Sequence, residues 1–241
     1  MIPARARHRE ALAWGAIFVL AALVFSVWPE LDAWATGQFY HPALPMPFPV
    51  DQWALVQLFY RYVPWLGRVL WIGTMLCLLP VLARRLSVRW RRRSWGLLIV
   101  LVLGLWLAVN AGLKEYWGRP RPSDTTLFGG PHVYQPVWRP SDLCDRNCSF
   151  VSGHAGTGFA LMAVGLAAAP ATRRRWLAVG LAAGLAFGLA RVAQGAHFAS
   201  DVIFSGLTLW GITQLTRAVW LRQRLRRRRR RVALAAGAAA D

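Results

Sequence analysis

Three short segments of an otherwise apolar chain carry charged and imidazole side chains whose types and spacing could do chemistry. In chain order they hold Lys114, Arg121 and Pro122, then Ser152, Gly153 and His154, and then Arg191, His197 and Asp201. Ionisable groups inside or beside long apolar runs are costly, so those that persist there are candidates for function. A lone histidine in such a place is more often structural, but that reading does not explain three clusters.

The side chains of these segments form a set suited to phosphoryl transfer: three cations, two imidazoles and one carboxylate. Guanidinium forks match phosphate oxygens in a bidentate manner and stabilise the charge of the transition state. One imidazole can attack phosphorus to form a phosphohistidine, while the second protonates the leaving oxygen. Because no cluster of carboxylates suited to Mg²⁺ or Ca²⁺ accompanies them, the set favours chemistry without a metal or other cofactor.

Local spacing suggests how two of the segments work. His197 and Asp201 stand four residues apart, and in a helix this spacing places both on one face. The carboxylate could then accept the ring N–H and leave the other ring nitrogen as a nucleophile. Ser152 and Gly153 precede a helical run, whose first N–H groups can hold an anion. A serine hydrolase is not indicated, because no glycine stands two residues before Ser152.

The three segments resemble the signature of the type 2 phosphatidic acid phosphatase superfamily. That signature reads Lys, six residues, Arg-Pro; then Pro-Ser-Gly-His; then Ser-Arg, five residues, His, three residues, Asp. All spacings within the parts are kept between Lys114 and Asp201, but Val151 replaces the usual Pro and Ala190 the usual Ser. The second change removes a hydroxyl that could donate to phosphate. The stretch from FGG to CDRNCSFVSGHA is similar to bacterial lipid A phosphatase-like members.

The resemblance assigns roles to the residues. It implies that His197 is the nucleophile, that Asp201 orients it, and that His154 is the general acid and later the base that activates water. The phosphate-binding groups that it implies are Lys114, Arg121, Arg191, Ser152 and the backbone of Gly153. For Arg119, in the same run as Arg121, two readings stay open: a fourth phosphate contact, or an ion pair with a lipid headgroup or within the loop.

The elements that must position these residues are predicted to be membrane helices. The chain has 241 residues, of which 56% are hydrophobic, and a net charge of +19. This apolar content excludes disorder, and three cysteines are too few for a disulfide scaffold. Six apolar runs are long enough to suggest spans, at about 11–28, 63–83, 95–113, 155–169, 176–194 and 202–221. We therefore predict an all-α bundle of six transmembrane helices and a single domain over 1–241.

The distribution of charge predicts the orientation. If the N-terminus lies inside, 21 of the 29 basic residues face the cytoplasm. Both termini are then cytoplasmic, the protein is a bacterial inner-membrane protein, and the three polar segments face the periplasm. The basic tail at about 222–241 is expected to be disordered. Its arginine run could bind nucleic acid, but contact with anionic lipid or a role in topology is the better reading, because the run follows an apolar span.

Two outer segments carry further features. The stretch DQWALVQLFYRYV, at 51–63, fits an amphipathic interfacial helix, either a plain connector or a vestibule for a lipid substrate. Cys144 and Cys148 could form a disulfide if their loop faces an oxidising periplasm.

These observations predict an enzyme that hydrolyses the phosphate ester or diphosphate of a membrane lipid. Lipid A, undecaprenyl diphosphate, phosphatidylglycerophosphate and phosphatidic acid are all candidate substrates. The expected partners are therefore the phosphorylated lipid and the bilayer, with no nucleic acid, and the oligomeric state is open. One alternative passes the phosphoryl group from the same site to a second lipid. A transporter without enzymatic activity, whose buried charges form a permeation path, is a weaker alternative.

Overall fold

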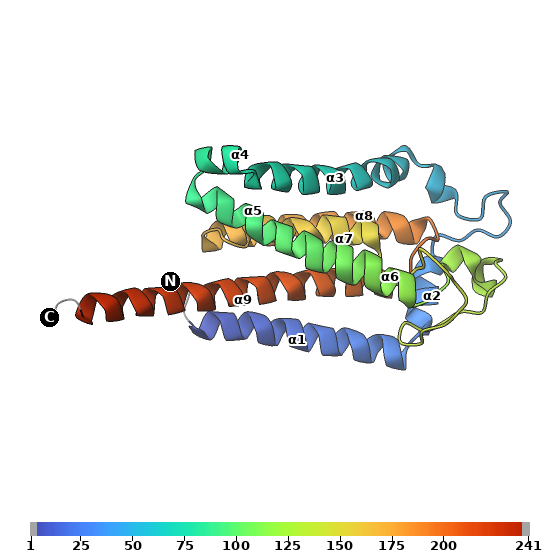
Figure 1. Cartoon of the computed structure of the whole chain (residues 1–241). Coiled ribbons are helices and arrows are strands. Elements are labelled where there is room, and N and C mark those ends of the chain that lie inside the picture. Colours follow the sequence, from blue (N-terminus) through green and yellow to red (C-terminus); the bar gives the residue numbers. More distant parts are fainter. Residues whose placement is uncertain (1–3, 238–241) are drawn as a thin grey trace.

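A computed structural model describes residues 4–237, and its regular structure is helical apart from an isolated bridge between Thr125 and His132 (Figure 1). The α-helices are α1 (Ala4–Val27), α2 (Glu30–Gly37), α3 (Ala54–Leu78), α4 (Pro80–Arg85), α5 (Val88–Val100), α6 (Lys114–Tyr116), α7 (Gly153–Ala160), α8 (Pro170–Ala193) and α9 (Ala199–Gly237). The remaining helical segments are η1 (Pro49–Gln52), η2 (Leu101–Leu113), η3 (Pro122–Asp124), η4 (Thr126–Phe128) and η5 (Leu161–Gly165). The predicted all-α class is confirmed.

The long helices lie side by side along one axis, and the two ends of this bundle differ (Figure 1). Helix α2 and the loop of residues 117–152 gather at one end, which we call the outer end. The start of α1, helix α4, the start of α8 and the end of α9 lie at the opposite, inner end. The arginine-rich stretches of the sequence belong to these inner elements.

Three helices are long and apolar enough to cross a membrane: Arg9–Val27, Val88–Tyr116 and Pro170–Ala193. They coincide with the first, third and fifth of the predicted spans. The other three predicted runs fall in α3, in the short pair of α7 and η5, and in α9, so the arrangement with six spans remains a prediction.

Helix α9 continues through the basic segment that we expected to be disordered. Residues 222–237 are helical, whereas 238–241 lie outside the described residues. The segment consists largely of arginine, leucine and alanine, which are good helix formers, and it extends a helix that is already nucleated.

The helix from Val88 to Tyr116 combines α5, η2 and α6, and its middle part is π-helical. In that part, the side-chain amide of Asn110 donates to the carbonyl oxygen of Leu105 at 2.6 Å. Such π segments are frequent at functional sites, because they shift the side chains that follow. Here the residue that follows directly is Lys114.

Helix α7 is buried in the middle of the bundle, and every residue from Ala155 to Ala160 is buried. A Cβ atom on Gly158 would lie 2.6 Å from the backbone nitrogen of Gly184 in α8. Glycines therefore allow the two backbones to approach closely, as they do in many membrane helix pairs. This packing fixes the first turn of α7, with Gly153 and His154, at the outer end.

The inner end is tied together by Glu10 of α1. Its carboxylate pairs with Arg217 of α9 at 2.6 Å, and with Arg173 of α8. The side chain of Gln214 also donates to Glu10, at 3.2 Å. One acidic residue thus joins three helices at the end opposite the polar segments.

Candidate active site

The turn between α8 and α9 places His197. Gly195 adopts a left-handed φ of +66°, and its N–H donates to the carbonyl oxygen of Val192 at 2.9 Å. The N–H of Ala196 donates to the carbonyl oxygen of Arg191 at 3.0 Å. These two bonds form a Schellman motif, which ends α8 and is favoured by glycine at the left-handed position. His197 follows this motif directly, so it lies close to the last turn of α8.

The imidazole of His197 is only 1% exposed and is held through its Nδ1 atom. Nδ1 lies 2.7 Å from the carbonyl oxygen of Ser149. A carbonyl oxygen can only accept, so Nδ1 carries the proton and Nε2 keeps its lone pair. The side chain is therefore fixed in the tautomer that a nucleophile needs.

The predicted contact between His197 and Asp201 is less direct than expected. His197 lies before the first residue of α9, Ala199, so the two side chains do not share a helical face. Nδ1 of His197 and Oδ2 of Asp201 are 3.7 Å apart, which is too long for a hydrogen bond. Asp201 accepts instead from the hydroxyl of Ser149 at 2.5 Å and from the N–H of Phe198 at 2.8 Å.

The charge states of these two groups follow from their surroundings. Burial, opposed by Asp201 and reinforced by Lys114 and Arg191, lowers the pKa of His197 to about 3. The ring is therefore neutral at pH 7. Burial alone would raise the pKa of the Asp201 carboxyl, but the positive charge of Arg119, the nearby His197 ring and the hydrogen bond from the Ser149 hydroxyl hold that pKa at about 2. Asp201 is therefore ionised.

The second histidine, His154, is the second residue of α7 and lies against α3. Its Nε2 atom is 3.3 Å from the carbonyl oxygen of Tyr60, and its ring stacks on the Tyr60 ring with centroids 5.8 Å apart. Burial and the neighbouring cations of Arg191, Lys114 and Arg121 lower the pKa of His154 to about 4. The imidazole thus lies in a strongly positive environment.

Lys114 and Arg191 are buried basic residues that lack acidic partners. They are 9% and 7% exposed, and no carboxylate among residues 4–237 lies within ion-pair distance of either. Nη1 of Arg191 donates to the side chain of Gln194 at 2.6 Å, and its guanidinium lies 5.0 Å from the Tyr60 ring centroid. Its Nε has no hydrogen-bond partner in the described part of the chain. A site with this charge and these donors is suited to an anion.

The start of α7 is held by a cap from its own N-terminus, by α9 and by close packing against Asn110 of η2. Ser152 is the N-cap, and its hydroxyl accepts from the N–H of Ala155 at 3.4 Å. The N–H of Ser152 donates to the carbonyl oxygen of Asp201 at 3.2 Å, which ties α7 to α9. A Cβ atom on Gly153 would lie 2.9 Å from the side-chain oxygen of Asn110, so a larger residue would not fit without a shift.

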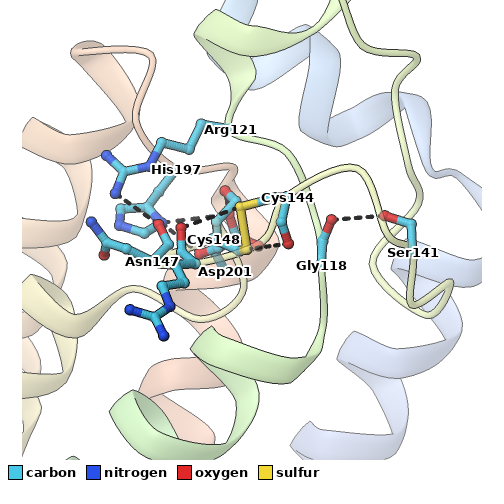
Figure 2. The surroundings of a disulfide bond; sticks show 10 residues. Gly118, Arg121, Ser141, Cys144, Asn147, Cys148, His197 and Asp201 are labelled. Carbon is cyan, nitrogen blue, oxygen red and sulfur yellow. Dashed lines mark hydrogen bonds and ion pairs between the residues drawn. A yellow bond between two sulfur atoms is a disulfide. The ribbon is translucent and has the colours of Figure 1, made fainter.

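Cys144 and Cys148 form a disulfide in the loop that borders the site (Figure 2). The N–H of Cys148 donates to the carbonyl oxygen of Lys114 at 3.1 Å. Between the two cysteines, the carbonyl oxygen of Asn147 accepts from Nη2 of Arg121 at 2.9 Å, as Figure 2 shows. The bridged loop therefore orients one of the predicted phosphate-binding residues and contacts the backbone of another.

The structure gives Arg119 an ion pair, but its partners lie in α2 and α9 and not in its own loop or in a lipid headgroup. Its guanidinium is completely buried and pairs with Asp32 at 2.8 Å and with Asp201 at 2.6 Å. It is an internal ion pair and not a phosphate contact. Sequence reasoning missed Asp32, because a single aspartate in a short outer helix carries no motif that sets it apart. Within the described residues, no group of three His, Cys, Asp or Glu side chains could hold a metal ion.

The polar segments converge at the outer end of the bundle, and the region that holds them matches a known enzyme class. Residues 94–227 match the profile of the PAP2 superfamily, and all three segments lie within that range. The chain therefore belongs to the PAP2 superfamily, the type 2 phosphatidic acid phosphatases that the signature indicated, and it is a phosphoric ester hydrolase.

The similarity between this chain and known proteins extends beyond the three signature segments. A lipid A 4′-phosphatase of Francisella tularensis subsp. novicida is 32% identical over 209 residues, which cover 85% of this chain and 92% of the relative. A lipid A 4′-phosphatase of Rhizobium leguminosarum is 39% identical over 109 residues, or 45% of this chain and 46% of the relative. No solved structure matches the chain significantly. These relatives and the three candidate membrane helices indicate a lipid phosphatase of the bacterial membrane.

Proposed function

We propose that this chain removes phosphate from a lipid through a phosphohistidine on His197, with a lipid A phosphate as the first substrate to test. One observation carries the mechanism: Nδ1 of His197 is fixed at 2.7 Å from a carbonyl oxygen, so that Nε2 keeps its lone pair in a site with buried basic residues. The names of the relatives support the choice of lipid A.

In the first step, the phosphate oxygens are bound by Lys114, Arg121 and Arg191, and by the N–H groups at the start of α7. Nε2 of His197 attacks phosphorus, the N–P bond forms, and the bond from phosphorus to the lipid oxygen breaks. His154 gives its proton to that leaving oxygen. The cations stabilise the charge on the transferring phosphoryl group.

In the second step, His154 accepts a proton from water, and the water oxygen attacks phosphorus. The N–P bond breaks, His197 becomes neutral again, and inorganic phosphate leaves. Overall one water is consumed for each lipid phosphate, and no electron transfer is involved.

Substrate binding and protonation of His154 are coupled in this mechanism. Without substrate, burial and the cations keep the pKa of His154 near 4, so the ring is neutral at pH 7. A bound phosphate dianion offsets the field of Lys114, Arg121 and Arg191 and therefore raises that pKa. The general acid thus acquires its proton only when the group that needs it is present.

The proposed arrangement has six spans, cytoplasmic termini and a periplasmic site. Its support is that the arginine-rich stretches lie at the inner end, whereas the site lies at the outer end (Figure 1). The disulfide lies at the same end as the site, as expected for a loop in an oxidising compartment.

The test is a phosphate-release assay with the purified protein in detergent, on lipid A, undecaprenyl diphosphate, phosphatidylglycerophosphate and phosphatidic acid. We expect release from at least one lipid, inhibition by vanadate, no effect of EDTA, and a loss of at least about 10⁴-fold in His197→Ala. The exposed His41 supplies the matched control, because His41→Ala should keep full activity. Activity that persists in His197→Ala would contradict the mechanism. If the phosphate of the substrate is labelled, transfer of the label into a second lipid would identify a phosphotransferase.

A further inference from the structure

Behind the proposed nucleophile, one guanidinium joins two carboxylates from distant parts of the chain. Nη2 of Arg119 pairs with Asp32 of α2, and Nη1 pairs with Asp201 of α9. Nε of Arg119 donates to the carbonyl oxygen of Gln135 at 3.0 Å, and the guanidinium lies 4.2 Å from the ring centroid of Phe198. A planar fork with three engaged nitrogens cannot be replaced by the single ammonium of lysine.

Asp32 also holds the first turn of α9. Its Oδ1 atom accepts from the N–H of Ser200 at 2.8 Å, and its Oδ2 atom accepts from the Ser200 hydroxyl at 2.5 Å. Ser200 is the second residue of α9, so a carboxylate from α2 occupies the positive end of that helix. Because His197 lies just before this turn, the position of its ring depends on the bonds made by Asp32.

The charges in this buried cluster have a second consequence. Asp201 lies 3.7 Å from Nδ1 of His197, where its charge would stabilise the positive ring formed when Nε2 bonds to phosphorus. Arg119, paired with Asp201 at 2.6 Å, opposes that effect. Asp32 pairs with the same guanidinium from the other side and offsets part of its charge. Burial and the nearby Asp201 raise the pKa of Asp32, but both of its oxygens face donors, including the Arg119 guanidinium, and this arrangement fits the ionised form.

We propose that Asp32 is a positioning residue of the active site, acting on His197 through Ser200 and on the charge of Asp201 through Arg119. The inference rests on the proposed function, because it assigns a role in forming the phosphohistidine. It extends the site to α2, outside the residues 94–227 that match the superfamily. Asp32 touches neither the substrate nor the reacting atoms, so it acts on the rate of the chemical step and not on binding.

The test compares Asp32→Asn with Glu30→Gln in the full chain in detergent. Both changes replace a carboxylate of α2 by its amide, but Glu30 is exposed, whereas Asp32 is 1% exposed. We expect kcat to fall by about 10- to 100-fold in Asp32→Asn, in the range seen when residues that orient catalytic groups are changed. KM should stay within about twofold, and Glu30→Gln should match the wild type.

Rapid-quench measurement with labelled lipid separates positioning from a loss of folded protein. In Asp32→Asn, the fraction of molecules that bind vanadate should equal that of the wild type, while the rate at which phosphoenzyme forms falls. Ser200→Ala removes the hydroxyl bond to Asp32 and the hydroxyl that accepts from Nη1 of Arg119, but it keeps the backbone bond to Asp32, so it should give a smaller effect of the same kind.

Two results would overturn the inference. One is a kcat of Asp32→Asn within twofold of the wild type; the other is a fall in kcat fully explained by a smaller fraction of active molecules. A wild-type protein that releases no phosphate and forms no phosphoenzyme would instead overturn the proposed function, and this inference with it. An active wild type with an unaffected Asp32→Asn would overturn the inference alone.

Discussion

Buried basic side chains at the outer end of the bundle fall into two groups with opposite surroundings. Arg119 is fully buried between the carboxylates of Asp32 and Asp201. Lys114 and Arg191 are nearly as buried, but no carboxylate in residues 4–237 pairs with either. A buried charge is costly unless it is compensated. The protein itself compensates the charge of Arg119, whereas we propose that the phosphate of the substrate compensates the charges of Lys114 and Arg191.

The difference predicts two kinds of mutational effect. Removing a cation that the protein pairs leaves carboxylates buried without a partner, so stability should fall. Removing a cation that only the substrate pairs relieves repulsion in the empty site, so activity should fall while stability is kept.

The largest expected effect is that of Arg191→Gln on activity. The buried guanidinium is one of the proposed donors for the phosphoryl oxygens, so we expect kcat/KM to fall by about 10²- to 10³-fold. The thermal midpoint should stay equal to or above that of the wild type, because a buried cation without a carboxylate partner is removed. Phosphate release and thermal unfolding in detergent measure the two quantities. A large fall in thermal midpoint with unchanged activity would place Arg191 in the first group.

Arg119→Gln should lower the stability of the protein, in contrast to Arg191→Gln. It leaves Asp32 and Asp201 without their guanidinium, which should lower the free energy of unfolding by about 3–5 kcal/mol. Arg139→Gln is the control, because Arg139 is exposed in the same loop. Unfolding in detergent compares the three proteins. An Arg119→Gln protein as stable as the control would show that the buried pairs contribute nothing.

The burial and positive surroundings of the two histidines predict that the stability of the protein depends on pH. The pKa values of His154 and His197 are lowered from 6.5 to about 4 and about 3. Above about pH 6.5 both rings are neutral in the folded and the unfolded chain. As the pH falls below that value, the unfolded chain binds protons that the folded chain does not, so stability falls. Thermal midpoints between pH 7 and 4.5 test this.

Vanadate supplies the matching control for that measurement. As an anion bound among the cations, it should raise the thermal midpoint and raise the pKa of His154, so that the fall in stability with decreasing pH is shallower. A midpoint that does not change between pH 7 and 4.5, with or without vanadate, would contradict the lowered pKa values.

The smallest expected effect is that of removing the disulfide. The double variant Cys144→Ser and Cys148→Ser loosens the loop whose Asn147 carbonyl orients Arg121. For so short a loop the cost in stability should be about 2 kcal/mol. KM should rise while kcat changes little, because the proposed role of Arg121 is to bind phosphate and not to transfer protons. Cys77→Ser, within α3, is the control, and a large fall in kcat would contradict the assignment.

The sequence was sufficient for the helical class and for the three segments that converge. Their spacing predicts which residues meet because each segment lies at an end of a helix, and neighbouring ends of packed helices lie close together. It did not predict how the groups meet. The expected contact between His197 and Asp201 assumed a helix through both residues, whereas the Schellman turn at Gly195 places the histidine before α9.

Partners that are distant in the sequence could not be predicted at all. The sequence marked Arg119 as unusual, but its role was decided by Asp32, which lies 87 residues away and has no motif around it. The number of membrane spans also could not be predicted from the hydropathy of single segments, because α3 and α9 contain arginines and α7 is only 8 residues long. The positions of such helices are determined by packing against neighbouring helices and not by their own hydropathy.

The separation of Asp32, Arg119 and Asp201 along the chain has a consequence for biogenesis. Synthesis proceeds from the N-terminus, so α2 is complete long before residue 119 leaves the ribosome, and Asp201 follows 82 residues after that. The carboxylate of Asp32 can therefore pair with Arg119 before Asp201 is synthesised, but its bonds to Ser200 form only once α9 has packed into the bundle. The group formed by Asp32, Arg119 and Asp201 is therefore complete only after α9 has packed against the rest of the bundle.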